Sequence, residues 1–229
     1  GSAMATVSGL SKLQLLIANI AQLPSLIAGV FGTWNLGWLD TPLPGAVSVC
    51  SIIAFAAIAF SALGQVQGWK LASVIYATAA LFGFPLYVLL KTHALVGSSV
   101  QPRYLLPVLL IVLAVLLSGR ELRFSVPQIA VIIAAMSLAN SLALYANLKR
   151  YVLGADAAGF NLNTNAAWWW DSGPDPMTVW FLGSVAFGVA SLCAGLLLLP
   201  SQRRSLSSRG LQQVPQDITD TLADQGVST

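Results

Sequence analysis

Long apolar runs separated by short polar connections dominate this chain. Five runs predict transmembrane helices, because about 20 apolar residues, each rising about 1.5 Å, cross a hydrocarbon core of about 30 Å. These runs are residues 44–64, 71–90, 104–119, 126–148 and 178–199. The pattern therefore predicts an all-α protein, a polytopic bundle of transmembrane helices.

A sixth apolar stretch, residues 13–32, is long enough to span a membrane but is less uniform. Asn19, Gln22 and Pro24 interrupt it, so its apolar residues do not form one continuous run. Such a stretch can span the membrane, re-enter it, or lie in the interface as an amphipathic helix. We expect it to span, as a sixth transmembrane helix at the N-terminus.

The composition independently supports a membrane protein. Hydrophobic residues make up 56% of the chain and charged residues only 8%, whereas about a quarter of the residues of a soluble domain are charged. A chain of this kind cannot cover a surface that faces water, so lipid must be much of its solvent. We expect one transmembrane domain over residues 5–199, after an expression scar at residues 1–4 and before a disordered tail at residues 200–229.

Several kinds of chemistry find no support in the sequence. Cys50 and Cys193 lie in different apolar segments, so we expect no disulfide bond. The chain contains no phosphate-binding loop, zinc-protease motif, paired-cysteine motif or nucleophile elbow. We therefore expect no metal site and no cofactor, and the charge pattern does not favour nucleic acid as a partner.

Lys and Arg flank the apolar runs unevenly, which predicts an orientation. With a cytoplasmic C-terminal tail, the inner side holds Lys70, Arg120, Arg123, Arg203, Arg204 and Arg209, and the outer side holds Lys91, Arg103, Lys149 and Arg150. The Arg203-Arg204 pair, just after the last run, supports this choice most. The longer, more aromatic connections at residues 33–43, 92–103 and 149–177 then lie outside, where we expect the functional surface.

Arg103 precedes the shortest run, residues 104–119. To cross the membrane, this run must recruit residues 100–103, which would draw Arg103 to about the depth of the lipid headgroups. A guanidinium at that depth needs a carboxylate, a carbonyl or a phosphate as its partner. Asp40 is one candidate partner, although it also suits a helix cap, and the phosphate of a lipid-linked substrate is another.

Three consecutive tryptophans, Trp168, Trp169 and Trp170, precede the last run. They fit the aromatic belt of a membrane interface, and the alternative is a platform on which a sugar or lipid headgroup stacks. Asp171 follows them and is a candidate to bind hydroxyl groups. Asp171 and Asp175 form only a weak cation pattern, because no third ligand lies in the run. The single histidine, His93, defines no site by itself.

Two segments carry a resemblance to a known family. GWLDTPLP at residues 37–44 and QPRYLLPVLLIVL at residues 101–113 resemble the C-terminal half of the domain-of-unknown-function family 2142 (DUF2142). This family contains predicted bacterial polytopic membrane proteins, grouped with C-type glycosyltransferases. Its Gly-Arg-Tyr pattern has Pro102 in place of the glycine, while Arg103 and Tyr104 match. We expect the resemblance to extend over residues 13–199.

The resemblance implies ligand contacts for Asp40, Arg103 and Tyr104. C-type glycosyltransferases carry their catalytic acid in a first outer loop, before the region that this chain resembles, so no catalytic base is transferred. We expect a multi-pass protein of the bacterial inner membrane with a cytoplasmic C-terminus.

The leading hypothesis for its function is a cell-envelope module, similar to C-type glycosyltransferases, that binds a polyprenyl-phosphate-linked sugar on the extracytoplasmic face. Arg103 would hold the phosphate, and Trp168 to Trp170 would hold the sugar or the prenyl edge. The competing hypothesis is a non-enzymatic scaffold, accessory subunit or small transporter half. Membrane lipid, and either a partner chain or a separate N-terminal half, are the expected partners. The sequence does not decide whether the chain is an enzyme.

Overall fold

The computed structural model describes residues 10–35, 41–63, 66, 68–98, 100–118, 124–154, 156–170 and 172–212, with side chains up to residue 197. The helices are α2 (Lys12–Ala28), the π-helix η1 (Gly29–Thr33), α3 (Gly45–Leu63), α4 (Trp69–Lys91), the 3-10 helix η2 (Pro102–Tyr104), α5 (Leu106–Leu117), α6 (Val126–Val152) and α7 (Pro176–Gln212). Each of the six predicted apolar segments is helical, which confirms the all-α architecture.

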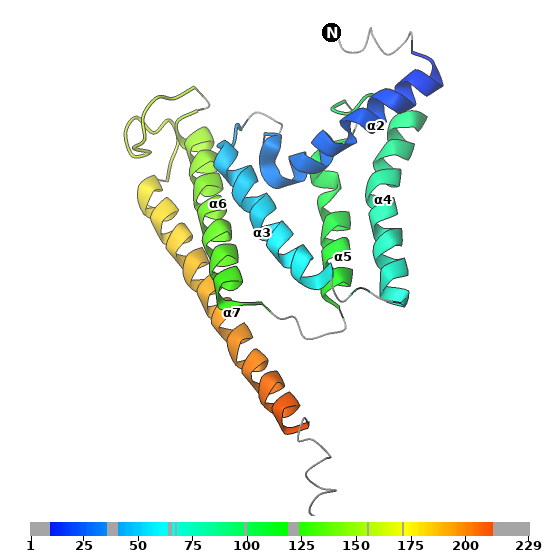
Figure 1. Cartoon of the computed structure of the whole chain (residues 1–229). Coiled ribbons are helices and arrows are strands. Elements are labelled where there is room, and N and C mark those ends of the chain that lie inside the picture. The colour runs from blue at the N-terminus through cyan, green and yellow to red at the C-terminus, as the bar shows by residue number, and fades with distance from the viewer. Residues whose placement is uncertain are drawn as a thin grey trace, which may run out of the picture.

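The helices form a bundle in which α6 packs between α3 and α7, and α4 packs beside α5 (Figure 1). The connections from η1 to α3, from α4 to η2 and from α6 to α7 all lie at one end, which we call the loop-bearing end. The last turns of α3 and α5, the first turns of α4 and α6, and the C-terminal part of α7 lie at the opposite end. The predicted sorting of long and short connections to two ends is therefore what the fold shows.

Helix α2 enters the bundle from the loop-bearing end and returns to it. Its first residue, Lys12, shares a groove with Lys91 and His93 at the C-terminal end of α4. Beyond Gly32, whose φ of 94° reverses the chain, Trp34 lies against Gly97 of the α4–η2 connection. Both ends of α2–η1 therefore meet the same connection, and we call the segment re-entrant because it starts and ends at the same end of the bundle.

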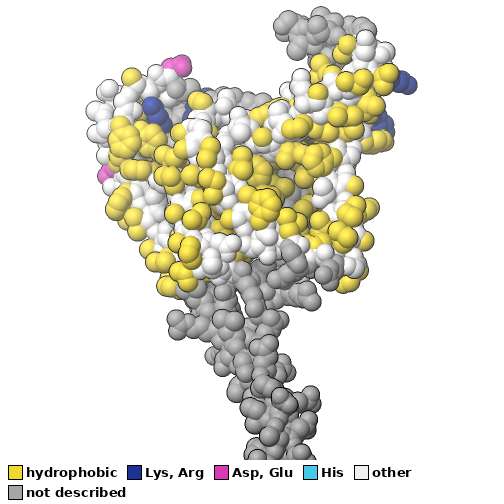
Figure 2. Space-filling model, viewed as in Figure 1, with side chains coloured by type: hydrophobic (Ala, Val, Ile, Leu, Met, Phe, Trp, Pro, Cys, Tyr) yellow, Lys and Arg dark blue, Asp and Glu magenta, His cyan; other side chains and the backbone are white. Residues whose placement is uncertain are grey.

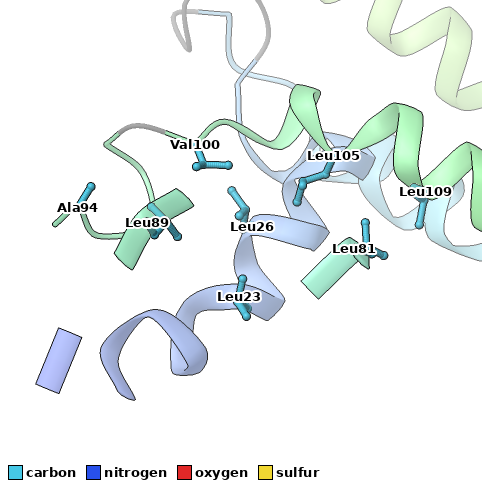
Figure 3. Packing of buried hydrophobic residues seen from close by; sticks show 8 residues of the cluster. All are labelled: Leu23, Leu26, Leu81, Leu89, Ala94, Val100, Leu105 and Leu109. Atoms are coloured by element: carbon cyan, nitrogen blue, oxygen red, sulfur yellow. The ribbon is translucent and has the colours of Figure 1, made fainter. Parts of the chain in front are cut away.

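A hydrophobic cluster fixes the deepest part of this path. Leu23 and Leu26 of α2 pack in one cluster with Leu81 and Leu89 of α4 and with Leu105 and Leu109, and Leu26 lies near the centre of this cluster (Figure 3). Phe31 of η1 meets Phe55 of α3 edge to face, with ring centroids 5.2 Å apart. By length and composition, Lys12–Thr33 is apolar enough to cross a membrane, as predicted, while its two ends lie at the same end of the bundle.

Four further helices are long and apolar enough to cross a membrane: Gly45–Leu63, Trp69–Lys91, Val126–Val152 and Pro176–Leu197. Helix α5 is shorter than predicted. Together α5 and η2 extend only about 24 Å, at about 1.5 Å per α-helical and 2 Å per 3-10 residue.

The structure shows that the shortest run does not recruit residues 100–103 into its α-helix. Residues 100–103 do not join α5, and Arg103 is exposed on the separate turn η2. Pro107 favours the break, because its ring would crowd the carbonyl of Arg103 in a continuous α-helix, although α2 and α4 accommodate Pro24 and Pro85. At the first turn of α5, by contrast, the missing N–H of Pro107 is harmless.

The flanks of the bundle are hydrophobic, as a lipid-facing surface requires (Figure 2). Phe60 and Leu197, for example, are 73% and 78% exposed. Between α6 and α7 the packing uses small residues. A Cβ on Gly195 would lie 2.6 Å from Ile133, and the Ser184 hydroxyl donates to Ser141 Oγ at 3.0 Å. Small side chains and interhelical hydrogen bonds of this kind are typical of membrane helices.

The last helix is longer than expected. It continues through Pro200 to Gln212, where we had expected a disordered tail from residue 200. Pro200 removes one helical hydrogen bond, but the following residues are rich in Gln, Arg and Leu, which favour helix. The rest of the predicted tail, residues 213–229, lies outside the described residues.

The re-entrant path predicts on which side of the membrane each end of the chain lies. In a variant with Cys50 and Cys193 replaced by serine, a single cysteine at Ser11 should react with an impermeant maleimide from the same side as one at Ser172. A cysteine at Ser207 should react only after permeabilisation. If α2 crossed the membrane, the cysteine at Ser11 would instead be labelled together with the one at Ser207.

Candidate functional site

The loop-bearing end is built around one buried amide. Asn19 of α2 has no exposed surface. Its Nδ2 donates to the carbonyl of Ala94 at 3.0 Å, and its Oδ1 accepts from the N–H of Val96 at 3.0 Å. Both backbone groups belong to the connection after α4. Asn19 thus fixes the re-entrant helix to this connection and satisfies two backbone groups that no helix satisfies.

A close contact between a glycine and a proline ring positions the turn that carries Arg103. Gly29, at the junction of α2 and η1, packs so tightly on the ring of Pro102 that an added Cβ would clash with it. Pro102 begins η2 and is buried, while Arg103 and Tyr104 on the same turn are exposed. The guanidinium carbon of Arg103 lies 5.5 Å from the centroid of the Tyr104 ring. The structure thus presents an arginine and an aromatic ring together at the loop-bearing end.

Asp40, the predicted carboxylate partner of Arg103, lies outside the described residues, as does Asp171 beside the tryptophans. Their predicted roles in ligand binding remain predictions.

The three tryptophans form one cluster. Trp170 meets Trp168 and Trp169 edge to face, with ring centroids 5.0 and 4.9 Å apart. Trp169 Nε1 donates to the carbonyl of Pro174 at 2.8 Å, while Trp168 and Trp170 are 58% and 60% exposed. The cluster offers two exposed indole faces at an angle to each other, and not one flat platform.

The connection that carries the tryptophans is a folded cap on α6 and α7. Asp175 is the N-cap of α7, because its Oδ1 accepts from the Thr178 N–H at 2.9 Å. Asn163 Nδ2 donates to the same carboxylate at 2.9 Å, and Asn163 Oδ1 accepts from the Met177 N–H at 3.0 Å. The hydrogen bond from the Thr178 backbone, with those from its hydroxyl and from Asn163, holds the pKa of Asp175 below its usual value.

The two parts of the predicted site are separate. Figure 1 shows the α6–α7 connection over α6 and α7, on the far side of α3 from η2. The tryptophans and Arg103 thus share an end of the bundle but not one pocket. Within the described residues, no group of three or more His, Cys, Asp or Glu side chains comes together to hold a metal ion.

Sequence reasoning missed the role of Asn19. Its position inside an apolar stretch was visible, but the interruption was taken only as a weakness of the predicted span. A carboxamide in an apolar helix needs partners, and this was the one signal that pointed to a tertiary contact.

Comparison with protein families supports the resemblance to DUF2142. Residues 3–112 match the model of this family, which is described as a predicted membrane protein. The match includes the Arg103-Tyr104 turn and ends within α5, whereas we had expected the resemblance to extend to Leu199. No curated protein and no solved structure matches the chain.

The role of Asn19 can be tested by substitution. Asn19→Ala should lower the free energy of unfolding by about 1–3 kcal/mol, because the buried backbone groups of Ala94 and Val96 lose their partner. Thermal unfolding in detergent measures this loss. Gln22→Ala on the exposed face of the same helix is the matched control, and an equal loss in both variants would contradict the anchoring role.

The N-cap of α7 predicts a pH dependence. Since the pKa of Asp175 is lowered in the folded chain, its charged form stabilises the fold above the pKa of the unfolded state. That contribution should disappear as the pH falls through the lowered folded-state pKa. Asp175→Asn keeps a capping oxygen without the charge, so the melting-temperature difference between the two proteins should shrink below about pH 4. A difference that stays constant from pH 7 to pH 3 would show that the charge contributes nothing.

Proposed function

We propose, taking the DUF2142 match over residues 3–112 as the premise, that the loop-bearing end of this membrane protein binds a lipid-linked sugar phosphate. The observation that carries the proposal is the turn η2, which presents Arg103 and Tyr104 side by side at that end. This turn lies inside the matched region and directly precedes an apolar helix. A ligand with its lipid chain in the bilayer and its headgroup in water would meet the turn at the membrane surface.

The chemistry of Arg103 suits a phosphate. A guanidinium offers N–H donors in a planar fork, which matches two phosphate oxygens at once. Tyr104, 54% exposed beside it, offers an aromatic face and a hydroxyl to a sugar ring. Arg103 thus contributes charge and geometry, and Tyr104 contributes apolar contact.

The tryptophan cluster forms a second contact surface in this proposal. It lies across the end of α3 from Arg103, so it does not touch the same phosphate. Its exposed indole faces at Trp168 and Trp170 suit either a more distant sugar of an extended headgroup or the interfacial region of the bilayer. We place this surface on the extracytoplasmic side of the bacterial inner membrane, opposite the Arg203-Arg204 pair.

We assign binding, and not catalysis, to the described residues. The acidic side chains that the structure describes are Asp156 and Asp175, and Asp175 is engaged as the cap of α7. In this proposal a partner chain or a separate N-terminal half supplies any catalytic carboxylate. The same observation favours the competing function, a non-enzymatic accessory subunit.

Substitution of Arg103 tests the proposal. Arg103→Ala should weaken binding of polyprenyl phosphate to the purified chain at least about tenfold, or about 1.4 kcal/mol, and Arg103→Lys should recover only part of it. Stabilisation by added polyprenyl phosphate in thermal unfolding measures the affinity. Lys149→Ala, at the same end of the bundle, is the matched control and should bind normally.

A carboxylate partner would give a different result. If Asp40 holds Arg103, then Arg103→Ala and Asp40→Ala should each lower the melting temperature without ligand, and the double variant should lose less than their sum. If neither ligand stabilisation nor intrinsic stability changes in Arg103→Ala, the proposed phosphate site is wrong.

A further inference from the structure

A groove separates the first turns of α2 from the last turns of α4. Its volume is about 590 Å³, and it lies at the loop-bearing end. Leucines of both helices form its apolar lining, among them Leu15, Leu16 and Leu90. Lys12 from α2 and Lys91 from α4 also line it, and both are exposed. Two lysines from different helices thus flank one apolar groove.

The charged side chains that line the groove, Lys12 and Lys91, are both positive. In the part of the chain that the structure describes, its lining contains no acidic side chain. The Nζ of Lys91 lies 3.5 Å from the Tyr87 hydroxyl and 5.7 Å from the centroid of its ring, so the lysine folds back along α4 beside the groove. Two ammonium groups at one site repel each other, and an anion between them removes that repulsion.

His93 adds a third polar group to the lining. It has a φ of 49°, in the left-handed region that glycine adopts most easily. The backbone around it closes the end of α4, since the Ala94 N–H donates to the carbonyl of Leu89 at 2.9 Å. These backbone contacts place His93 in the lining of the groove, two residues after Lys91.

We propose that this groove binds an anionic membrane phospholipid. Its phosphate would lie between Lys12 and Lys91, within reach of His93, and one acyl chain would follow the leucines. A soluble anion would use the lysines but leave the apolar lining without a partner. A zwitterionic lipid would fill the lining, but the positive charge of its own headgroup would meet the lysines. A lipid of net negative charge satisfies both surfaces.

The proposal does not depend on the function assigned to Arg103. The groove lies at the N-terminal end of α2, whereas Gly29 and the turn of Arg103 lie at the other end of that helix. A lipid bound here bridges α2 and α4, and so holds the re-entrant helix against the bundle.

Thermal unfolding of the purified full chain in dodecyl maltoside tests this inference. Phosphatidylglycerol in large excess over its dissociation constant should raise the melting temperature by about 5 °C, and phosphatidylcholine with the same acyl chains should raise it much less. In Lys12→Gln/Lys91→Gln the shift with phosphatidylglycerol should fall to that with phosphatidylcholine. Lys149→Gln is the matched control, because it removes a cation from the same end and should keep the full shift.

Three results would overturn the inference. Equal shifts with the two lipids would exclude charge recognition, and an unchanged phosphatidylglycerol shift in the double variant would place the lipid elsewhere. A full shift with inorganic phosphate alone would show that the site takes a free anion and not a lipid. Circular dichroism and native mass spectrometry separate loss of binding from loss of fold, since a folded double variant should retain helix but lose bound phosphatidylglycerol. Because the Arg103 variants leave both lysines in place, they should keep this shift even if polyprenyl phosphate does not bind.

Discussion

The hydrogen bonds of Asn19 to the backbone of Ala94 and Val96 are the interaction on which the loop-bearing end depends. Away from water, a backbone N–H or carbonyl without a partner costs on the order of 1–3 kcal/mol. The connection after α4 leaves helical geometry beside an apolar bundle, so it needs side-chain partners. Asn19 supplies one donor and one acceptor from a position with no exposed surface. The re-entrant path of α2 brings that side chain to the connection.

The short helix α5 shows a related constraint, since the irregular backbone before it also needs protein around it. Pro107 disfavours a helix that continues back to Arg103, and the chain before it forms the 3-10 turn η2 and not an α-helix. Irregular backbone at membrane depth is tolerated only where protein covers it, and Leu23 and Leu26 of α2 provide that cover (Figure 3). At the other end of α5, Lys70 Nζ donates to the carbonyl of Ser118 at 2.9 Å, although Lys70 is only 8% exposed. A cation at the C-terminal end of a helix also interacts favourably with the helix dipole.

The apolar runs were sufficient to predict the helices, because the side chains of each helix are either buried in the bundle or face lipid along the whole helix. The path of α2 was not predictable in this way. Its length and composition fit a helix that crosses the membrane. Its position in the bundle depends on contacts between residues far apart in the sequence, such as the hydrogen bond between Asn19 and Ala94, which are 75 positions apart. The break before α5 is a different case, since the sequence contained a signal for it: Pro107 follows Arg103 at the spacing where its ring crowds the Arg103 carbonyl of an α-helix. Reasoning from span length alone outweighed that signal and extended the apolar run through residues 100–103. The groove between Lys12 and Lys91 could not be predicted from the sequence either, because only the path of α2 in the fold brings these two lysines together.

Helix α2 therefore takes part in both candidate binding surfaces. Its N-terminal turns, with Lys12, form one wall of the groove. At its C-terminal end, the contact of Gly29 with the ring of Pro102 positions the turn that presents Arg103. Between these two ends, its attachment consists of leucine packing and the single amide of Asn19. A ligand that binds at either end contacts the same helix, and if binding at one end changes the affinity at the other, linkage makes that effect reciprocal. The re-entrant segment thus connects the proposed lipid groove beside α4 with the turn η2 that presents Arg103. At Gly29 only a glycine fits against the ring of Pro102, which makes this contact the tightest constraint on where the segment meets that turn.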